Sequence, residues 1–159
     1  MSVIPLPDGP GHDDRFTGPR CAVRFIGQAH VAHGVLAPVA ACLRHHIEDP
    51  YAAYLDLHVD SPDPITWVFA RCLLAEGLRT HTGLGDVTVH PAPVDAFAAV
   101  VVNLSPEGDG PVCRISLPTG AVREFLDRSE QISAPGSEHL NLDIDALIHR
   151  LLTDPPPSP

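Results

Sequence analysis

The chain has 159 residues, enough for one domain with its own core, and carries twenty acidic against ten basic side chains. All ten basic residues are arginine and the formal charge is −10, so cations that could bind nucleic acid or anionic membrane surfaces are scarce. No apolar run approaches the roughly 20 residues of a membrane-spanning helix, and the first residues lack the pattern of a signal peptide. We therefore expect a cytoplasmic protein without membrane insertion.

Both ends of the chain differ in composition from the middle. Residues 1–19 are rich in proline and glycine and show little apolar periodicity. Residues 154–159 hold four prolines and are expected to form a short polyproline tail. We predict a disordered arm over 1–19, a folded domain over 20–153 and a disordered tail over 154–159.

The first half of the domain alternates apolar and polar residues, which is typical of strands with one buried face. In the clearest segment Tyr54, Asp56 and His58 alternate with apolar residues, and Asp60 follows. Turns at 49–50 and 61–64 separate such segments, so we predict three or four antiparallel strands in a meander. The expected buried positions are Cys21, Val23 and Phe25, then Val39, Ala41, Leu43 and Ile47, then Ala53, Leu55, Leu57 and Val59, with 65–69 as the next strand.

Further strands are predicted beyond a short helix at 71–78. The Gly83-Leu84-Gly85-Asp86 segment reads as a turn into a strand at 87–90. Residues 97–104 are nearly all apolar, which indicates a strand buried on both faces. A hairpin loop at 106–110 then leads to a returning strand at 112–117.

Two helices are predicted at the carboxyl end, with Thr119 and Asp143 as their capping residues. Their apolar residues recur at the spacing of one helix face, and we expect both faces to lie in the core, with a partner surface as the alternative for the last helix. The order of elements predicts an α+β fold, in which an antiparallel sheet or barrel-like meander packs with a short central helix and two C-terminal helices. The apolar stripes are Val122, Phe125 and Leu126, and Ile144, Leu147, Ile148 and Leu151.

Motifs of common enzymes are absent from the sequence. There is no GxSxG, HExxH, GxxxxGK[ST] or GxGxxG pattern, and a chain without lysine cannot supply a Walker or Schiff-base lysine. One acid–base trio, Asp56, His58 and Asp60, is expected on a single strand face. The solvated face of an amphipathic strand is the favoured interpretation of this trio.

Histidine and cysteine spacing does not favour a metal or cofactor. Strand residues three apart or adjacent point to opposite faces, so neither His30 with His33 nor His45 with His46 is expected to chelate. We expect these histidines on a solvated polar face. The cysteines have no CxxC spacing and are expected to be reduced, small buried residues; they are Cys21, Cys42, Cys72 and Cys113.

Four segments together carry a family resemblance: Asp49-Pro50-Tyr51-Ala52, then 65–71, 73–78 and 82–87. In this spacing, and with 105–108, 125–128 and the Leu142-Asp143 helix, the sequence resembles the SsgA-like family of actinobacterial sporulation and cell-division regulators over residues 21–152. The run from Trp67 to Leu78 is more similar to the SsgB subgroup than to the SsgA subgroup. The signature positions to which we assign structural roles are Asp49, Pro50, Tyr51, Trp67, Phe69, Arg71, Leu74, Glu76, Gly77, Gly83, Gly85 and Asp86.

The resemblance implies a non-enzymatic role in septum formation, at division septa in the cytoplasm. It implies FtsZ and other SsgA-like proteins as partners, and a homotrimer with a fold like that of Whirly-type single-stranded-nucleic-acid-binding proteins. It supplies no catalytic, cofactor-binding, metal-binding or partner-binding residues. The arm and the tail depart from the family pattern and leave open a paralogue that acts in spore-wall assembly.

Three functions are weighed from the sequence. A protein–protein adaptor is favoured; an enzyme built on the acid–base trio would need a deep pocket. A single-stranded nucleic-acid binder would need stacking aromatics and a cluster of arginines on one face, drawn from Arg20, Arg24, Arg44, Arg71, Arg79 and Arg114. We expect Trp67 and Phe69 to anchor the core and Gly83 and Gly85 to supply unusual backbone angles.

Overall fold

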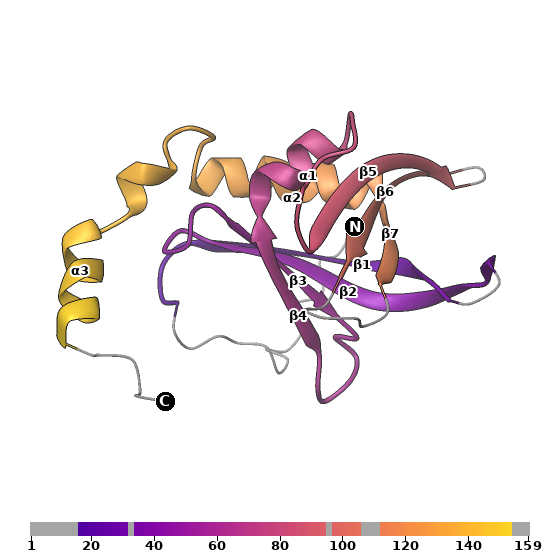
Figure 1. Ribbon diagram of the computed structural model, residues 1–159, viewed down its shortest axis with the longest axis horizontal. Helices are drawn as coiled ribbons and strands as arrows, with labels where there is room; N and C mark the ends of the chain where they lie inside the picture. Colours follow the sequence, from indigo (N-terminus) through magenta and orange to yellow (C-terminus); the bar gives the residue numbers. More distant parts are fainter. Residues whose placement is uncertain (1–15, 32–33, 95–96, 106–111, 154–159) are drawn as a thin grey trace, which may run out of the picture.

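The computed structural model describes residues 16–31, 34–94, 97–105 and 112–153. They form one curled antiparallel sheet with α-helices, so the predicted α+β class is confirmed (Figure 1). The strands are β1 (Arg20–His30), β2 (Leu36–His46), β3 (Ala52–Leu57), β4 (Ile65–Ala70), β5 (Val87–Val94), β6 (Phe97–Leu104) and β7 (Cys113–Pro118). The helices are α1 (Arg71–Gly77), α2 (Thr119–Ile132) and α3 (Ile144–Thr153), with a short 3-10 turn, η2 (Glu138–Asn141), between the last two.

Two meanders build the sheet, in the spatial order β4-β3-β2-β1-β7-β6-β5. The first four strands pair with their sequence neighbours, as the alternation predicted. The last three strands form the second meander, and β7 joins the first by pairing antiparallel with the end of β1. Within the described residues β4 and β5 are therefore the edge strands, and Val89 of β5 forms an isolated bridge with Thr82.

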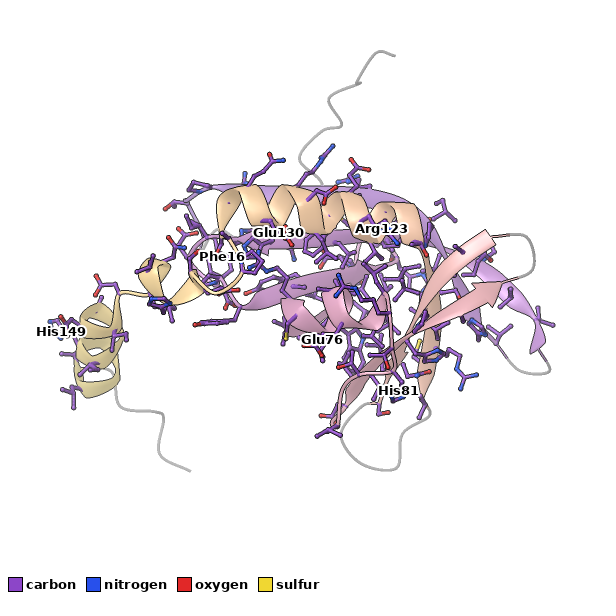
Figure 2. All side chains as sticks on the ribbon, turned by 90° about the horizontal axis from the view of Figure 1, so that it is seen from above. Phe16, Glu76, His81, Arg123, Glu130 and His149 are labelled. Carbon is purple, nitrogen blue, oxygen red and sulfur yellow. The ribbon has the colours of Figure 1, made fainter. Side chains whose placement is uncertain are left out.

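The inner face of the sheet is apolar and is covered by α2 and α1 (Figure 1). Helix α2 buries Val122, Phe125 and Leu126 against this face, and its exposed side carries Arg123 and Glu130 (Figure 2). The stripe predicted for this helix is thus core. Odd-numbered residues of β1 to β4 supply the sheet side of the core, because alternate strand residues share one face.

The outer face of β1 to β4 differs from the prediction at β3. All six residues of β3 are buried, including Tyr54 and Asp56, so the expected solvated face is wrong for this strand. The middle of strand β6 agrees with its prediction, since Ala99 to Val102 are all buried, whereas Ala98 is exposed. The difference at β3 arises from polar partners on neighbouring strands, which the sequence pattern of one strand does not contain.

The helix ends only partly follow the capping predictions. Helix α1 covers Arg71–Gly77, close to the predicted 71–78. Helix α2 begins at Thr119 itself, its N-cap is Pro118 and no side chain caps it, so the predicted Thr119 cap is wrong. Before α3, the Asp143 carboxylate accepts a hydrogen bond from the Ala146 N–H at 2.8 Å, which is the predicted cap.

Helix α3 lies apart from the sheet, at the far end of a C-terminal arm (133–153) that leaves α2 (Figure 1). Ile144 and Ile148 of the predicted stripe are exposed, so the prediction that they lie in the core is wrong. Leu152, outside that stripe, is exposed as well, and the side chains of Leu147 and Leu151 lie outside the described part of the chain. No helix among the described residues is long and apolar enough to cross a membrane. Most of the predicted arm (1–15), the predicted tail (154–159) and the predicted hairpin loop (106–110) lie outside the described residues.

Candidate functional site

The arm that carries α3 is anchored to the body by Arg71, the first residue of α1. The Arg71 side chain is buried and donates a hydrogen bond from Nη1 to the Ser133 carbonyl oxygen at 2.8 Å. The same nitrogen donates to Ser129 Oγ at 3.3 Å, and Nη2 forms an ion pair with Glu138 Oε1 at 3.0 Å. One side chain thus joins α1 to the end of α2 and to η2.

The charge arrangement favours this anchor at neutral pH. The backbone N–H of Glu138 itself and the Arg71 guanidinium hold the pKa of the Glu138 carboxyl below its usual range, against an opposing effect of burial. The carboxylate is therefore ionised at neutral pH, where it faces a charged guanidinium. Because the anchor grips both the end of α2 and η2, it fixes the direction in which the arm leaves the body.

Beyond this anchor the arm exposes large apolar side chains. Ile144, Ile148 and Leu152 follow one another at four-residue spacing and are 57, 48 and 78% exposed. Leu140 in η2 is 75% exposed. Such a row along a helix that lies off the body is typical of a surface that another protein covers. Figure 2 shows α3, with His149 labelled, well away from α2.

The predicted acid–base trio does not form a catalytic group. Asp56 is buried, forms a short ion pair with Arg44 Nε at 2.5 Å and accepts a hydrogen bond from Thr66 Oγ1 at 2.6 Å. His58 is exposed beyond the end of β3. Asp60 borders an open depression of about 360 Å³ whose lining includes neither Asp56 nor His58. The three side chains therefore do not share a pocket.

Histidines 45 and 46 contradict the expected solvated face, because they are 0 and 2% exposed. The adjacent side chains do point to opposite faces, as strand geometry requires. His45 Nδ1 lies 2.9 Å from the Ala52 carbonyl oxygen, and burial lowers the pKa of its imidazole. His30 Nε2 bonds Ser116 Oγ at 2.7 Å, and His33 lies outside the described residues.

Metal-binding geometry is absent from the described part of the chain, where no three His, Cys, Asp or Glu side chains converge. The cysteines are free, but only Cys42 is buried; Cys72 and Cys113 are exposed, so the expectation of burial is wrong for them. Burial raises the pKa of the Cys42 thiol to about 11, which keeps it protonated at neutral pH.

The six arginines named for nucleic-acid binding do not gather on one face. Arg71 is buried in the arm anchor and Arg44 is paired with Asp56. Arg114 donates from Nε to Asn103 Oδ1 at 3.0 Å on the other meander. Arg79 is exposed after the end of α1, and Arg20 and Arg24 are exposed on the outer face of β1. This arrangement places too little positive charge on one face for a groove that tracks phosphates.

The signature turn at 49–51 connects β2 to β3 and leads to the arm anchor. Asp49 Oδ2 accepts a hydrogen bond from the Tyr54 hydroxyl at 2.7 Å, and Pro50 is buried. The Tyr51 side chain is exposed, whereas its carbonyl oxygen accepts the Arg71 N–H at 2.7 Å. This turn therefore positions the first residue of α1.

Three apolar signature residues differ in how far their side chains are buried. Leu74 is fully buried and Phe69 is 7% exposed, and both belong to the main core. Trp67 is only half-buried, because it lies on the edge strand β4 and packs at the margin of the core. The three positions form a continuous path from the sheet edge to α1.

Glycine and acidic signature positions hold the segment between α1 and β5. A Cβ at Gly77 would lie 2.2 Å from Val89 Cγ1, so only glycine allows α1 to approach β5. Glu76 Oε2 accepts a hydrogen bond from Thr82 Oγ1 at 2.9 Å. Gly83 has a φ of 97°, whereas Gly85 is not in the positive-φ region; the Asp86 carbonyl oxygen accepts the Ser105 N–H at 2.7 Å.

The chain is similar in sequence to known proteins of sporulation and cell division. The family model described as SsgA, Streptomyces sporulation and cell division protein, matches residues 39–138. The Streptomyces coelicolor protein named sporulation-specific cell division protein SsgB is 39% identical over 118 residues, which cover 74% of this chain and 84% of that protein. The SsgB of Saccharopolyspora erythraea is 41% identical over 115 residues, 72% of this chain and 79% of the relative.

Solved structures agree with the sequence comparison. An SsgA-like sporulation-specific cell division protein from Thermobifida fusca has a TM-score of 0.74 and 31% identity, over 84% of this chain and 96% of that one. A structure reported for SsgB of Streptomyces coelicolor, with mutations that correlate to longitudinal cell division during sporulation, has a TM-score of 0.70 and 34% identity over 77 and 95% of the two chains. The chain belongs to the SsgA family of sporulation and cell division proteins, as the sequence resemblance implied.

Sequence reasoning missed two features that the fold brings together. Glu138 pairs with Arg71 across 67 residues, and nothing in its local pattern marks it. Phe16 was assigned to the disordered N-terminal arm (1–19), yet its ring stacks on His46 with ring centroids 4.5 Å apart. A lone aromatic residue within a proline- and glycine-rich segment is the one signal that could have indicated this contact.

Proposed function

We propose that this chain is a non-catalytic adaptor of sporulation-specific cell division, which acts in the cytoplasm at division septa. Its partners are FtsZ or other SsgA-like proteins, as the family resemblance implies. The observation that carries an adaptor function is the row of exposed apolar residues on α3, held away from the body by the Arg71 anchor. An exposed apolar helix supplies binding area without any catalytic group.

The proposal includes self-association, with α3 of one copy packed on the body of another. The row formed by Ile144, Ile148 and Leu152 stays exposed in a single copy, and the anchor keeps α3 from folding back on its own sheet. A second copy would cover this row in every molecule, so we assign the row to contacts between SsgA-like chains and not to contact with FtsZ. The resemblance implies that the closed assembly is a trimer.

Co-sedimentation of the full chain with FtsZ from the same host, with and without GTP, tests the adaptor function. We expect saturable sedimentation with FtsZ polymers in the presence of GTP, and no retention on single-stranded DNA. A pull-down with SsgA-like proteins of the host is the parallel assay. Arg123→Ala, on the exposed side of α2, is the matched surface control and should behave as the unaltered chain.

Failure of both assays, with the protein folded, would contradict the adaptor function. Retention on single-stranded DNA that falls steeply with salt would instead favour a nucleic-acid binder. A fluorescent fusion that stays diffuse while sporulation septa form would contradict the proposed location at septa.

A further inference from the structure

The first described residues of the chain lie on the outer face of the sheet, over a cluster of rings. Phe16 stacks on His46 with ring centroids 4.5 Å apart and planes at 23°. Phe16 and His46 both meet Tyr54 edge-on, with centroid distances of 6.0 and 5.4 Å. The phenylalanine ring thus covers the histidine, which is 2% exposed although it lies on the outer face.

The backbone after Phe16 is held at a defined place. Glu48 Oε1 accepts hydrogen bonds from the Thr17 N–H at 2.9 Å and the Gly18 N–H at 2.8 Å. The Pro19 carbonyl oxygen accepts the Ile47 N–H at 3.0 Å. Charge-assisted bonds of this kind are stronger than neutral ones, so the carboxylate of Glu48 is the main polar attachment of this segment.

Close approach at Gly18 shows that the contact requires a small residue. A Cβ at this position would lie 2.7 Å from Ile47 Cγ2 and 3.1 Å from the Glu48 carboxyl carbon. Real Cβ atoms do not come as near as the distance to Ile47, so a larger residue would require the segment or the Ile47 side chain to shift. The Phe-Thr-Gly segment therefore binds this surface by the ring of Phe16 and the backbone amides of Thr17 and Gly18, and the lack of a side chain at Gly18 allows the close approach.

The histidine below the ring is neutral by geometry. Its Nε2 lies 3.2 Å from Arg44 Nη1, and because a guanidinium only donates, Nε2 must be the unprotonated acceptor. The proton of the neutral ring is then on Nδ1, which is buried without a hydrogen-bond partner among the described residues. A second proton would have to go onto Nε2, where it would face the donor of a cation.

We propose that Phe16, Thr17 and Gly18 form a strap that closes over His46 when its imidazole is neutral and lifts from it when the imidazole is protonated. Protonation of Nε2 removes the bond from Arg44 and places two cations in contact. Lifting the ring gives the imidazolium access to water, which relieves both its burial and this repulsion. The inference concerns the outer face and does not depend on the proposed function.

The charged surroundings of His46 act in the same direction. Burial lowers the pKa of the imidazole, and so do the charges of Arg44 on β2, Arg20 on β1 and neighbouring His45. Among the described residues Glu48 opposes them, and the Asp56 carboxylate on β3, which pairs with Arg44, offsets part of the arginine charge. With the strap lifted, the pKa returns toward the ordinary value of about 6.5. The lifted form therefore binds the proton more tightly, so the closed form is fully favoured above about pH 6.5 and loses ground as the pH falls below it.

The Glu48 attachment does not titrate in this range. Burial alone would raise the pKa of its carboxyl, but the amides of Thr17 and Gly18 outweigh that effect and hold the pKa below its usual value. Between pH 8 and 5.5 the carboxylate thus stays ionised. One proton on His46 then changes the ratio of lifted to closed strap by at most about tenfold per pH unit.

Nuclear magnetic resonance of the full chain labelled with ¹⁵N tests the switch. The amide resonances of Thr17 and Gly18 and the imidazole resonances of His46 are followed from pH 8 to 5.5. We expect both amides to move from closed to lifted positions with the same midpoint as His46, below pH 6.5. Phe16→Ala should shift the His46 midpoint upward toward about 6.5, and Gly18→Ala should give the lifted amide positions at every pH.

Two histidine variants separate the switch from general acid effects. His46→Gln keeps an acceptor for Arg44 and cannot titrate, so its Thr17 and Gly18 amides should stay closed down to pH 5.5. His58→Asn removes an exposed imidazole beyond the end of β3 at a positive φ that asparagine tolerates, and its Thr17 and Gly18 amides should respond to pH as those of the unaltered chain do. Amides that stay constant from pH 8 to 5.5 in the unaltered chain would overturn the proposal, as would an unchanged titration in a folded His46→Gln variant.

Discussion

Helices α2 and α3 share a sequence pattern but not an environment. Each has apolar residues at the spacing of one helix face, and each follows the second meander of the sheet. In α2 this face is buried: Val122 and Phe125 are 0% exposed. In α3 the corresponding face is open, with Ile144 and Ile148 57 and 48% exposed.

The difference shows what helical periodicity can and cannot predict. The spacing identifies which face of a helix prefers an apolar neighbour, but it carries no information on whether the neighbour belongs to the same chain. What decides between α2 and α3 is the Arg71 anchor, which directs the chain away from the sheet after Ser133. The predictions below first test the covered helix, then the anchor and the body, and finally the open helix.

The largest loss of stability is expected from the covered face of α2. Phe125→Ala removes a fully buried ring from the centre of the core and should lower the free energy of unfolding by about 3 to 5 kcal/mol. Urea denaturation followed by circular dichroism measures this. The control Arg123→Ala lies on the exposed side of the same helix and should change stability by less than about 0.5 kcal/mol. Similar effects of the two changes would mean that α2 is not the covered helix.

A smaller but still large loss is expected at the anchor. Arg71→Met leaves the Ser133 carbonyl oxygen and the Glu138 carboxylate without their cation, which should cost about 3 kcal/mol of folding stability. The exposed Arg79→Met is the matched control and should be neutral. Arg71→Met should also weaken self-association, because the C-terminal arm is then no longer held in one direction. Unchanged thermal stability of Arg71→Met would show that the arm is held by other contacts.

Packing between α1 and β5 should show a moderate effect. Gly77→Ala forces a methyl group against Val89 and should cost about 1 to 3 kcal/mol, as overpacking of a well-filled core does. The double variant with Val89→Ala makes room for the methyl group and should recover part of this loss. A double-mutant cycle of unfolding free energies measures the coupling. Additive losses would contradict direct contact between the two positions.

The smallest effect on stability is a pH dependence from buried histidine. Burial lowers the pKa of His45 in the folded chain, so the unfolded chain binds the extra proton more readily. Stability should therefore be intact above about pH 6.5 and fall as the pH drops below it, by at most about 1.4 kcal/mol per pH unit for each such histidine. Urea midpoints between pH 8 and 5.5 measure the slope, and His45→Gln should reduce it, with the contribution of His46 remaining. A slope that is the same in this variant would contradict the assignment.

Much of the sheet could be predicted because its signals are local. Alternation in β1 and the apolar run in β6 each specify burial from neighbouring residues in the sequence, and the structure agrees with them. Strand β3 shows the limit of this reasoning. Asp56 reads as a solvated position, but Arg44 lies beside it on β2 and pairs with it, which allows its burial. Predicting the burial of Asp56 requires the register between β2 and β3, which the sequence of one strand does not contain.

The candidate site was harder to predict than the fold. Family resemblance marked Arg71, yet the groups that it binds lie 58 to 67 residues away and form no motif. Open apolar residues on α3 have the same pattern as core residues, so the sequence alone assigned them to the core. Phe16 lies in a segment whose composition suggests disorder, and only the fold shows that Gly18 allows it to approach β2 and Glu48.

Light scattering of the purified full chain, coupled to size-exclusion chromatography, tests most directly whether α3 is an interface. We expect a defined assembly, a trimer on the family resemblance, and a monomer of 17.0 kDa for the double variant Ile144→Asp with Ile148→Asp. Because both side chains are exposed in a single copy, the variant should remain a folded monomer that unfolds cooperatively in urea. An unaltered chain that runs as a monomer at all concentrations, or a variant that keeps the assembly intact, would contradict the account.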